Sequence, residues 1–503
     1  MGRDKEAGMF ETAEVGQKVS KAEFAKAEPQ LRARLLEAQR QLREAKFPVI
    51  VIVSGVEAAG KSEVVNRLCE WLDARGIRSV AFWDESDEER ERPRHWRFWR
   101  RLPPAGTIGI LFGSWYTNPI VQRAFRESGR TAYHAELTQI TMLERTLTDG
   151  GALLVKLWFH ISKKEQARRL EKTLRKQKRK LTPWEKRFNK MYNRFAKVSE
   201  EAIRATDTGN APWHIVDAKD ARHRDLITGQ LLLKTIEQKL SARAAKTKAE
   251  KPESEKAERP AHGRRTILDT VNASARLTVE QYERELAELQ SRLNKLTWKA
   301  WQKKRSSVAL FEGWDAAGKG GAIRRVAAST DARLIQVIPV AAPTDEERAQ
   351  HYLWRFWRHL PRAGYMTIYD RSWYGRVLVE RVEGFATPEE WGRAFGEINA
   401  FEEQLSEHGI CLAKFWLHIT PEEQLRRFEE RQRLAHKRHK ITEEDWRNRK
   451  QWGAYEEAVD EMVARTSTAN APWTLVAAND KRHGRVTVLR TLCEALEKNL
   501  DKN

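Results

Sequence analysis

Apolar residues along this chain occur in two patterns, as short β-branched runs and as longer stretches with helical spacing. The run 49–54 is apolar and ends at a glycine-rich loop, and after Lys61 the apolar residues recur at helical spacing. A strand, a loop and a helix in this order are what a phosphate-binding loop requires. The same order recurs where the run 308–312 leads into a second glycine-rich loop. The hydrophobic pattern therefore predicts two α/β units.

Further strands and helices are predicted in both halves of the chain. The strands are 107–112, 152–158, 214–217, 365–369, 411–416 and 474–477. The helices are 29–45, 163–180, 183–205 and 279–295. The first of them begins with Pro29, at the position where a helix tolerates proline. Strands that alternate with helices indicate an α/β fold, in which a mostly parallel sheet is flanked by helices on both faces.

The two halves of the chain repeat one another. Gly55 and Gly313, which open the two loops, are 258 residues apart. The same offset recurs at other pairs, among them Trp96 and Trp354, Trp158 and Trp416, and His160 and His418. Near the end of each half the offset becomes 260, as between Asn210 and Asn470. The repeat predicts two tandem domains, 1–240 and 264–503, joined by a Lys-, Glu- and Ala-rich linker at 241–263 that is partly helical.

The composition makes the chain strongly basic. Of its 503 residues, 92 are Lys or Arg and 71 are Asp or Glu, so the formal net charge is +21. Such a charge attracts polyanions, namely nucleic acid, an anionic membrane or a phosphate polymer. A basic surface that only keeps the protein in solution is an equally weighted alternative. Charge alone does not choose among these interpretations.

The cysteines and the apolar runs bear on the compartment. Cys69, Cys411 and Cys493 lack metal-ligand spacing, and since no signal peptide is recognisable, we expect free thiols in a reducing cytoplasm. The longest apolar runs, such as 47–53, are far too short to span a bilayer. We therefore expect a cytoplasmic protein without a membrane segment.

Each half contains a Gly-x4-Gly-Lys loop, whose backbone N–H groups point at phosphate oxygens while the lysine adds a point charge. In the first half the candidate site consists of Gly55, Glu57, Gly60, Lys61 and Ser62, of which Glu57 could still bind a metal ion. In the second half the expected phosphate-binding residues are Gly313, Ala316, Ala317, Gly318, Lys319, Gly320 and Gly321. The first loop has the hydroxyl that normally binds Mg²⁺ after the lysine, and the second has glycine at that position.

Carboxylates in the second half compensate for the missing hydroxyl. Asp315 lies inside the loop, and Asp370 ends an apolar run. Asp370 is therefore expected at the carboxyl end of a strand, where ligands bind in open α/β sheets. Two carboxylates near Lys319 suit Mg²⁺, with Mn²⁺ as the alternative ion. A lone carboxylate at a strand end is usually a turn or cap residue, but its pairing with the loop lysine favours a metal site.

Arginines follow the second of these carboxylates. Arg371, and further on Arg376 and Arg381, are predicted to neutralise the charge that spreads over a migrating phosphoryl group. In the first half, Phe112 and Gly113 replace the acid and the first arginine. We therefore predict that the first site is catalytically degenerate, although it could still hold a polyanion.

The second half resembles the polyphosphate kinase 2 family. The matching segments are 313–319, 343–344, 353–355, 361–364, 370–374, 380–382, 415–419, 466–468, 471–473 and 479–481. The resemblance covers nearly the whole second half and, more weakly, the whole first half. It implies a P-loop kinase core with a mobile helical lid after the second acidic motif.

The tandem arrangement is similar to that of enzymes that move the terminal phosphate of inorganic polyphosphate to AMP, giving ADP. The resemblance therefore implies a Mg²⁺-dependent phosphotransferase whose partners are polyphosphate and AMP or ADP. Polyphosphate would also account for the basic excess. The basic stretches 163–180 and 426–440 are interpreted as a polyanion track, and the alternative is that they are solvated helix faces. A homo-oligomer is compatible with the sequence, which does not give the oligomeric state.

Three other functions stay open at this point. One is polyphosphate-dependent phosphorylation of nucleoside diphosphates. Another is an ATP-dependent nucleotide kinase, since polyphosphate and an ATP tail present the same groups to a phosphate-binding loop. The last is a non-enzymatic binder of polyanions or nucleic acid with vestigial loops, which the lack of a recognised zinc or RNA-binding motif disfavours.

Overall fold

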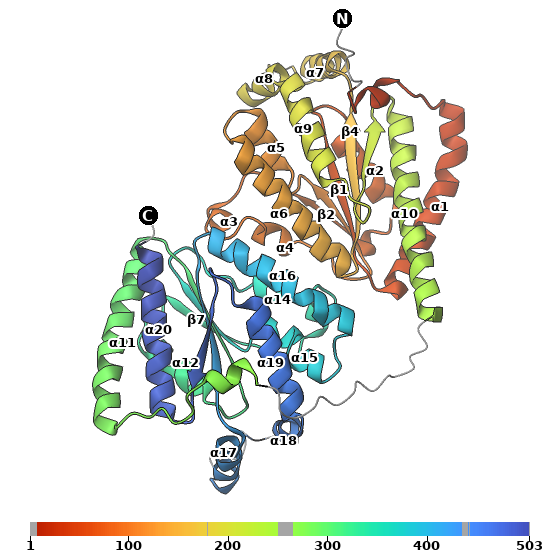
Figure 1. Cartoon of the computed structure of the whole chain (residues 1–503). Coiled ribbons are helices and arrows are strands. Elements are labelled where there is room, and N and C mark those ends of the chain that lie inside the picture. Colours follow the sequence, from red (N-terminus) through yellow and green to blue (C-terminus); the bar gives the residue numbers. More distant parts are fainter. Residues whose placement is uncertain (1–7, 179, 250–264, 435–440, 442, 502–503) are drawn as a thin grey trace, which may run out of the picture. The chain divides into compact units, whose positions relative to one another are not determined.

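A computed structural model of the chain describes residues 8–178, 180–249, 265–434, 441 and 443–501 (Figure 1). The chain forms two compact units. The N-terminal unit comprises Met1–Glu85, Phe98–Ser254 and Asp345–His351, and the C-terminal unit comprises Ser86–Arg97, Glu255–Thr344 and Tyr352–Asn503. Each unit thus includes one short segment from the other half of the sequence, which the repeat pattern does not predict.

The N-terminal unit is built on a parallel five-stranded sheet in the order β2-β3-β1-β4-β5. Its strands are β1 Val49–Gly55, β2 Ile77–Ala81, β3 Ile108–Phe112, β4 Leu153–His160 and β5 Trp213–Asp217. In the central strand, Val49 pairs with Ile108 on one side and with Leu153 on the other. Residues 49–53 are at most 1% exposed, as expected for a strand covered on both faces.

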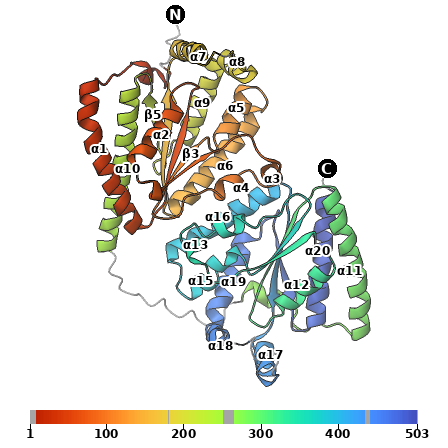
Figure 2. The same cartoon turned by 180° about the vertical axis from the view of Figure 1, so that it is seen from behind.

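Helices cover both faces of this sheet (Figures 1 and 2). The longer helices of this unit are α1 Lys21–Ala45, α2 Lys61–Trp71, α5 Thr117–Ala124, α6 Arg130–Asp149, α7 Lys163–Gln177, α8 Pro183–Lys190, α9 Tyr192–Thr206 and α10 Ala221–Ala249, of which α7 and α8 lie beyond the end of the sheet. α1 and α10 lie side by side on one face, and α5, α6 and α9 pack together on the other. Shorter helical segments in the first half of the chain are η1 Glu11–Glu14, η2 Ala74–Gly76, α3 Asp87–Arg90 and α4 Trp96–Trp99.

The C-terminal unit repeats this architecture around a parallel sheet in the order β10-β9-β6-β8-β7. Its strands are β6 Ser307–Gly313, β7 Ile335–Pro339, β8 Met366–Asp370, β9 Cys411–His418 and β10 Trp473–Ala477. The two sheets confirm the predicted α/β fold with tandem P-loop kinase-like units.

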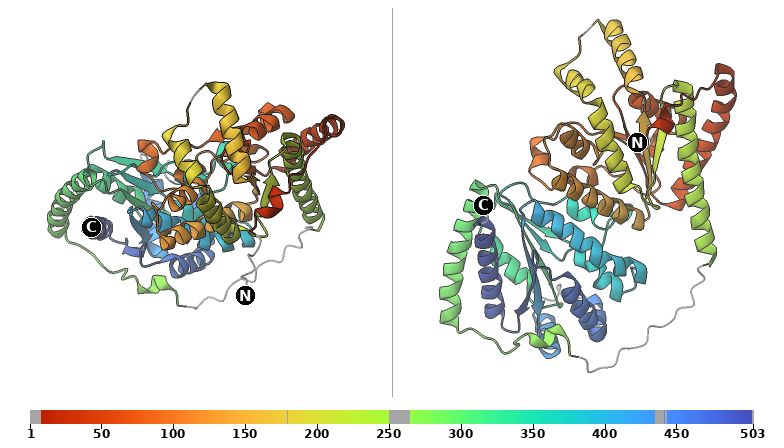
Figure 3. Two further views of the ribbon diagram at one scale, coloured as in Figure 1. Left: turned by 90° about the horizontal axis from the view of Figure 1, so that it is seen from above. Right: turned by 45° about the horizontal axis from the view of Figure 1, so that its top comes forward.

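The second half of the chain contributes the remaining helices. The longer ones are α11 Val279–Gln302, α12 Lys319–Ala328, α16 Pro388–Glu407, α17 Pro421–Arg433, α18 Glu443–Lys450, α19 Trp452–Thr466 and α20 Lys481–Leu500. The shorter ones are η3 Ile267–Thr270, α13 Asp345–Arg348, α14 Trp354–Trp357, η4 Trp373–Arg376 and α15 Val379–Val382. α11 and α20 lie side by side on one face of the sheet, and α16 and α19 pack on the other (Figure 3).

The hydrophobic pattern does not predict β2 and β7, which are the edge strands next to β3 and β8. In each of them only the first and fourth residues are partly buried, and the other three are exposed. The edge strands on the other side of each sheet, β5 and β10, bury their first, fourth and fifth residues and are predicted. β2 and β7 bury none of their residues fully, so their sequences lack the apolar run by which the other strands are recognised.

Two helix predictions are wrong in detail. The first helix begins at Lys21 and not at Pro29, because Ser20 and Glu23 form a capping box and the proline lies inside the helix. The predicted helix 183–205 is two helices, α8 and α9, separated by a turn at Met191. The predicted linker begins as helix, because α10 continues to Ala249, and its remaining residues 250–263 lie outside the described residues.

The other bulk predictions can be compared with the described residues. The three cysteines are free, and Cys411 and Cys493 are buried. None of the helices in the described part of the chain is long and apolar enough to cross a membrane. The predicted basic stretches fall mainly on α7 and α17, although residues 179 and 435–440 lie outside the described residues.

Candidate functional site

The second glycine-rich loop joins β6 to α12 and turns sharply at its glycines. Gly313 has a φ of +148°, and a β-carbon there would lie 2.5 Å from the carbonyl oxygen of Leu417, so only glycine fits. Gly318, the N-cap of α12, has a φ of 108°, and Ala316 has a positive φ of 63°. The loop therefore brings its backbone to the N-terminus of α12, where the positive end of the helix favours phosphate.

Lys319, the first residue of α12, folds back over the loop. Its Nζ donates hydrogen bonds to the carbonyl oxygens of Gly313 at 2.7 Å and of Trp314 at 3.3 Å. Burial lowers the pKa of the Lys319 ammonium below its ordinary value, and the nearby Asp315 carboxylate opposes this shift. The ammonium group is thus held at the centre of the loop.

The loop forms one wall of a cavity of about 480 Å³ at the carboxyl edge of the C-terminal sheet. We call it the phosphate cavity. The cationic residues that line it are Lys319, Arg324, Arg371, Arg427, Arg431, Lys481 and Arg485. Its acidic residues are Asp315, Asp370, Glu430 and Asp445. A concave surface with more cations than carboxylates attracts a polyanion.

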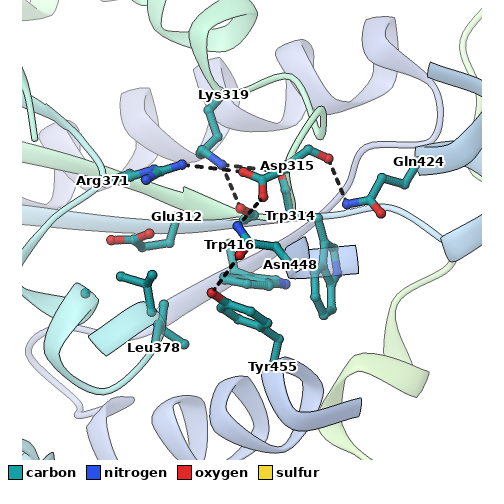
Figure 4. A pocket seen from close by; sticks show the side chains of 13 residues that line it. Glu312, Trp314, Asp315, Lys319, Arg371, Leu378, Trp416, Gln424, Asn448 and Tyr455 are labelled. Carbon is teal, nitrogen blue, oxygen red and sulfur yellow. Dashed lines mark hydrogen bonds and ion pairs between the residues drawn. The ribbon is translucent and has the colours of Figure 1, made fainter. Parts of the chain in front are cut away.

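Asp315, Arg371 and Asn448 meet over the loop (Figure 4). Nη2 of Arg371 lies 3.5 Å from Oδ1 of Asp315, and Nδ2 of Asn448 donates to Oδ2 of Asp315 at 2.9 Å. Asp370 ends β8, and the arginine after it has a φ of 65°, a conformation that costs energy outside glycine. The structure thus brings together four residues that the sequence singles out: Asp315, Lys319, Asp370 and Arg371.

Arg376 and Arg381 have other surroundings. Nη1 of Arg376 lies 3.0 Å from Oε2 of Glu380, and its guanidinium lies over the ring of Tyr352. Nη1 of Arg381 lies 2.6 Å from Oε2 of Glu461. Neither arginine is among the described residues that line the phosphate cavity. The structure therefore does not bring these two predicted residues to the loop.

Two residues of the site are not singled out by the sequence patterns. Glu312, on β6, accepts a hydrogen bond from the hydroxyl of Ser372 at 2.7 Å, and burial raises the pKa of its carboxyl. Arg427 of α17 donates to the carbonyl oxygens of Ala316 at 2.9 Å and Ala317 at 3.0 Å. An acid at the end of an apolar strand is a usable signal for Glu312. Arg427 is hidden by its many basic neighbours.

A smaller apolar pocket, of about 70 Å³, lies beside the phosphate cavity and shares Asp315, Lys319 and Arg371 with it (Figure 4). Its apolar and aromatic lining residues are Trp314, Leu378, Val379, Trp416 and Tyr455. Trp314 is fixed by stacking on Trp452, with ring centroids 3.7 Å apart. An apolar surface and a charged one therefore meet at these three shared residues.

A buried ion pair holds the segment that follows Asp370. Nζ of Lys414 lies 2.8 Å from Oε2 of Glu402, and Oε1 of Glu402 accepts from the indole of Trp373 and the hydroxyl of Tyr374. The N-terminal unit has the same network, made by Lys156, Glu144, Trp115 and Tyr116. Because it is present in both units, we regard this network as a support for the fold of each unit.

The first loop has a similar shape and different neighbours. Gly55 has a φ of +143°, and Nζ of Lys61 donates to two loop carbonyls at 2.9 and 3.0 Å. Glu57 takes the place of the loop aspartate, and its carboxylate lies 3.8 Å from Nζ of Lys61. Phe112 ends β3, and Gly113 after it has a φ of 76°. The N-terminal unit therefore keeps the loop and lacks the acid and arginine of the C-terminal unit.

Both halves of the chain match known proteins. The family profile described as Polyphosphate kinase 2 matches residues 18–244 and 276–503. The chain is 48% identical to a polyphosphate:AMP phosphotransferase of Pseudomonas aeruginosa, over 97% of this chain and 99% of that protein. It is 36% identical to a polyphosphate:AMP phosphotransferase of Acinetobacter johnsonii, over 94% and 97%. A crystal structure of a putative polyphosphate kinase 2 from Pseudomonas aeruginosa matches with a TM-score of 0.88 at 47% identity, covering 98% of this chain and 100% of that one.

Proposed function

The chain belongs to the polyphosphate kinase 2 family, and we propose that it transfers the terminal phosphate of inorganic polyphosphate to AMP, giving ADP. Two relatives matched over nearly their full length bear the name polyphosphate:AMP phosphotransferase. The observation that carries the proposal is that one cavity of the C-terminal unit is lined by Asp315, Lys319, Asp370 and Arg371 together. These shared lining residues support the proposal that the reaction takes place in this cavity.

Lys319 and the loop hold the phosphates around the group in transit. The N–H groups at the start of α12 point outward from the helix and bind phosphate oxygens. The Lys319 ammonium contacts the carbonyl oxygens of Gly313 and Trp314, and it can exchange these contacts for phosphate oxygens without leaving the loop. This arrangement fixes the phosphate chain relative to the acceptor.

Arg371 neutralises the charge that develops on the migrating group. In a loose transition state this charge spreads over the equatorial oxygens, and a planar guanidinium donates two parallel hydrogen bonds to such oxygens. Arg371 lines both the phosphate cavity and the apolar pocket, so it lies where donor and acceptor would meet. The attacking oxygen of AMP is already ionised, so no side chain needs to act as a strong base, and positioning supplies most of the rate.

Asp315 and Asp370 would hold a divalent cation, Mg²⁺ or alternatively Mn²⁺. Among the described residues, no group of three or more His, Cys, Asp or Glu side chains could hold a metal ion. In phosphoryl-transfer sites, however, Mg²⁺ takes one or two carboxylates and completes its shell with water and substrate phosphates. Both aspartates line the phosphate cavity, so these residues fit an ion that binds together with phosphate. Such an ion would neutralise charge between the donor and acceptor phosphates.

The proposed donor is polyphosphate because the phosphate cavity is lined by further cations besides the two that lie at the loop. Besides Lys319 and Arg371, the lining includes Arg431, Lys481 and Arg485. An ATP tail is short, whereas a linear phosphate polymer can contact every member of a longer series of cations. Each such contact releases counterions and so favours binding of the polymer.

Product analysis of the purified full chain tests this function. With Mg²⁺, polyphosphate and AMP, and without ATP, we expect ADP to form. Lys319→Ala is expected to lower the rate by about 100-fold or more, because it removes the fixed positive charge that lies beside the transferred phosphoryl group. Lys295→Ala, an exposed lysine on α11, is the matched control and should keep the wild-type rate.

The same assay separates the alternatives. If ATP but not polyphosphate converted AMP to ADP, the protein would be an ATP-dependent nucleotide kinase. If polyphosphate phosphorylated ADP but not AMP, the acceptor in the proposal would be wrong. If no donor gave any product while RNA bound at physiological salt, the non-enzymatic alternative would replace the proposal.

A further inference from the structure

The N-terminal unit contains a cavity of about 900 Å³ that the proposed reaction does not use. We call it the N-terminal cavity. It lies at the carboxyl edge of the N-terminal sheet, where β1 leads into the first loop and α2. Its lining combines loop residues, Lys61 and Ser62 among them, with further cationic side chains and with aromatic rings. This combination indicates a ligand that has both an anionic and an apolar part.

Cationic groups gather around the first loop. Nη1 of Arg169 donates to a loop carbonyl oxygen at 3.0 Å, which ties α7 to the loop. Arg224 lies against Gly60, where a β-carbon would meet its Nη1 at 1.7 Å. Arg224 is also held by Asp225, to which its Nε and Nη2 donate at 2.9 and 2.8 Å. Together with Lys61, these arginines place fixed positive charge beside the backbone N–H groups at the start of α2.

Aromatic rings form much of the remaining wall. They are Phe82, Trp83, Phe112, Tyr116, Trp158, Phe188 and Phe195. By the repeat, their counterparts in the C-terminal unit are Val340, Ala341, Asp370, Tyr374, Trp416, Asn448 and Tyr455. At four of these positions the N-terminal unit has a ring where the other unit has an aliphatic, acidic or amide side chain, and the four rings are Phe82, Trp83, Phe112 and Phe188. Trp83 is 78% exposed, so core packing does not explain this indole.

Trp158 adds a hydrogen-bond donor to this wall. The residue lines the N-terminal cavity and is 1% exposed, and its indole N–H has no hydrogen-bond partner among the described residues. An unpaired buried donor costs about 1–3 kcal/mol. A ligand acceptor in the cavity would remove this cost. The equivalent indole of Trp416, which lines the apolar pocket of the C-terminal unit, is unpaired in the same way, so this donor is a feature that the two sites share.

We propose that the N-terminal unit binds a nucleotide without transferring its phosphate. The phosphates lie on the first loop beside Lys61, and the base lies against the aromatic wall that includes Trp83 and Phe112. A polyphosphate chain has no apolar part and would leave this wall without a partner, whereas a nucleotide uses both surfaces. Since Phe112 and Gly113 replace the acid and arginine of the C-terminal unit, the bound nucleotide meets no transfer machinery. This inference goes beyond the proposed function and does not rest on it.

Calorimetric titration of the full chain tests the inference. The chain carries Lys319→Ala to disable the second loop, and the probes are ADP with Mg²⁺ and inorganic tripolyphosphate. We expect one ADP per chain, and a further Lys61→Met is expected to weaken ADP binding by about 10-fold or more, because it removes a charge-assisted contact.

Trp83→Ala separates a nucleotide from a phosphate polymer. Because Trp83 is exposed, its removal leaves the core intact, and circular dichroism of each variant checks the fold. In the Lys319→Ala chain this variant should weaken ADP binding by about fivefold or more, the loss expected for one base–aromatic stack, while tripolyphosphate binding stays within about twofold. Trp301→Ala, at a 43% exposed tryptophan of α11, is the matched control and should change neither.

Two results would overturn the inference. The first is that the Lys319→Ala chain binds no ADP, or binds it equally well after Lys61→Met. The second is that tripolyphosphate binds as tightly as ADP and Trp83→Ala affects neither, which would make the site a holder of polyphosphate. Both results concern binding at the first loop and not catalysis. The proposed conversion of AMP to ADP is tested separately, by product analysis of the wild-type chain.

Discussion

At the scale of single residues, the two units differ at a few positions with large chemical consequences. Arg371 occupies a positive φ of 65°, and in the N-terminal unit Gly113 occupies the equivalent place at 76°. Glycine adopts this conformation freely, whereas another residue loses about 1–2 kcal/mol. The C-terminal unit therefore keeps an arginine where the backbone prefers glycine, and a role on the transferred phosphate accounts for that cost.

Two substitutions of Arg371 separate its chemistry from its strain. Arg371→Ala and Arg371→Gly both remove the guanidinium, so both should lower the rate of ADP formation by about 100-fold or more. Only glycine relieves the positive φ, so Arg371→Gly should be more stable than Arg371→Ala by about 1 kcal/mol. Activity assays and thermal unfolding of the two variants check this. Identical unfolding temperatures would show that the backbone here is not strained.

The buried network around Lys414 should contribute strongly to stability. Lys414→Met leaves the carboxylate of Glu402 buried without its cation, which is expected to cost about 3–5 kcal/mol. Adding Glu402→Gln should recover part of this loss, because glutamine carries no charge and still accepts from Trp373 and Tyr374. Urea unfolding of the single and double variants measures both effects. A Lys414→Met protein that unfolds at the wild-type urea concentration would contradict this view of the network.

At the scale of elements, the sequence predicts the strands that are buried on both faces and misses the strands whose residues are mostly exposed. β1 is recognised by its apolar run, whereas β2 lies at the sheet edge and exposes three of its five residues. In the site, Asp315 and Lys319 are found because loop spacing is local. Arg427 is missed because the loop carbonyls that it contacts come from residues 111 and 110 positions earlier, a pairing that only the fold reveals.

Two glycines of the second loop should respond oppositely to alanine. At Gly313 a β-carbon would lie 2.5 Å from a backbone oxygen at a φ of +148°, whereas at Gly320 it would meet nothing within 4 Å. Gly313→Ala should therefore lower both stability and activity. Gly320→Ala should have a free energy of unfolding equal to that of the wild type or higher by up to about 1 kcal/mol, because alanine favours the helix. Thermal unfolding checks the pair, and a stable Gly313→Ala protein would refute the close approach.

At the scale of the whole molecule, duplication has produced two loops with different surroundings. The C-terminal unit surrounds its loop with aspartates, arginines and lysines, and the N-terminal unit surrounds its loop with cations and rings. The sequence alone predicts the repeat and the loss of the acid and arginine from the first half. It does not predict the N-terminal cavity, because Phe82, Phe112 and Phe188 come from segments far apart in the chain.

The cations of the phosphate cavity should make polyphosphate use dependent on salt. The apparent affinity for polyphosphate is expected to fall as ionic strength rises, because binding releases counterions. Arg485→Gln removes one lining cation. The negative slope of log affinity against log salt should therefore become shallower by about 0.7, the value per charge for a single-stranded polyanion. Measuring KM for polyphosphate at several salt concentrations gives both slopes. Equal slopes would mean that Arg485 does not contact the polymer.

The most direct test of the central claim, that the chemistry lies in the C-terminal unit, is the rate at which full-length Asp370→Ala makes ADP from AMP and polyphosphate. A loss of about 100-fold or more is predicted, with thermal unfolding unchanged. Asp331→Ala removes a carboxylate that pairs with Arg333 and does not line the phosphate cavity, and this control should keep the wild-type rate. ADP formation by Asp370→Ala at a rate near that of the wild type would contradict the assignment.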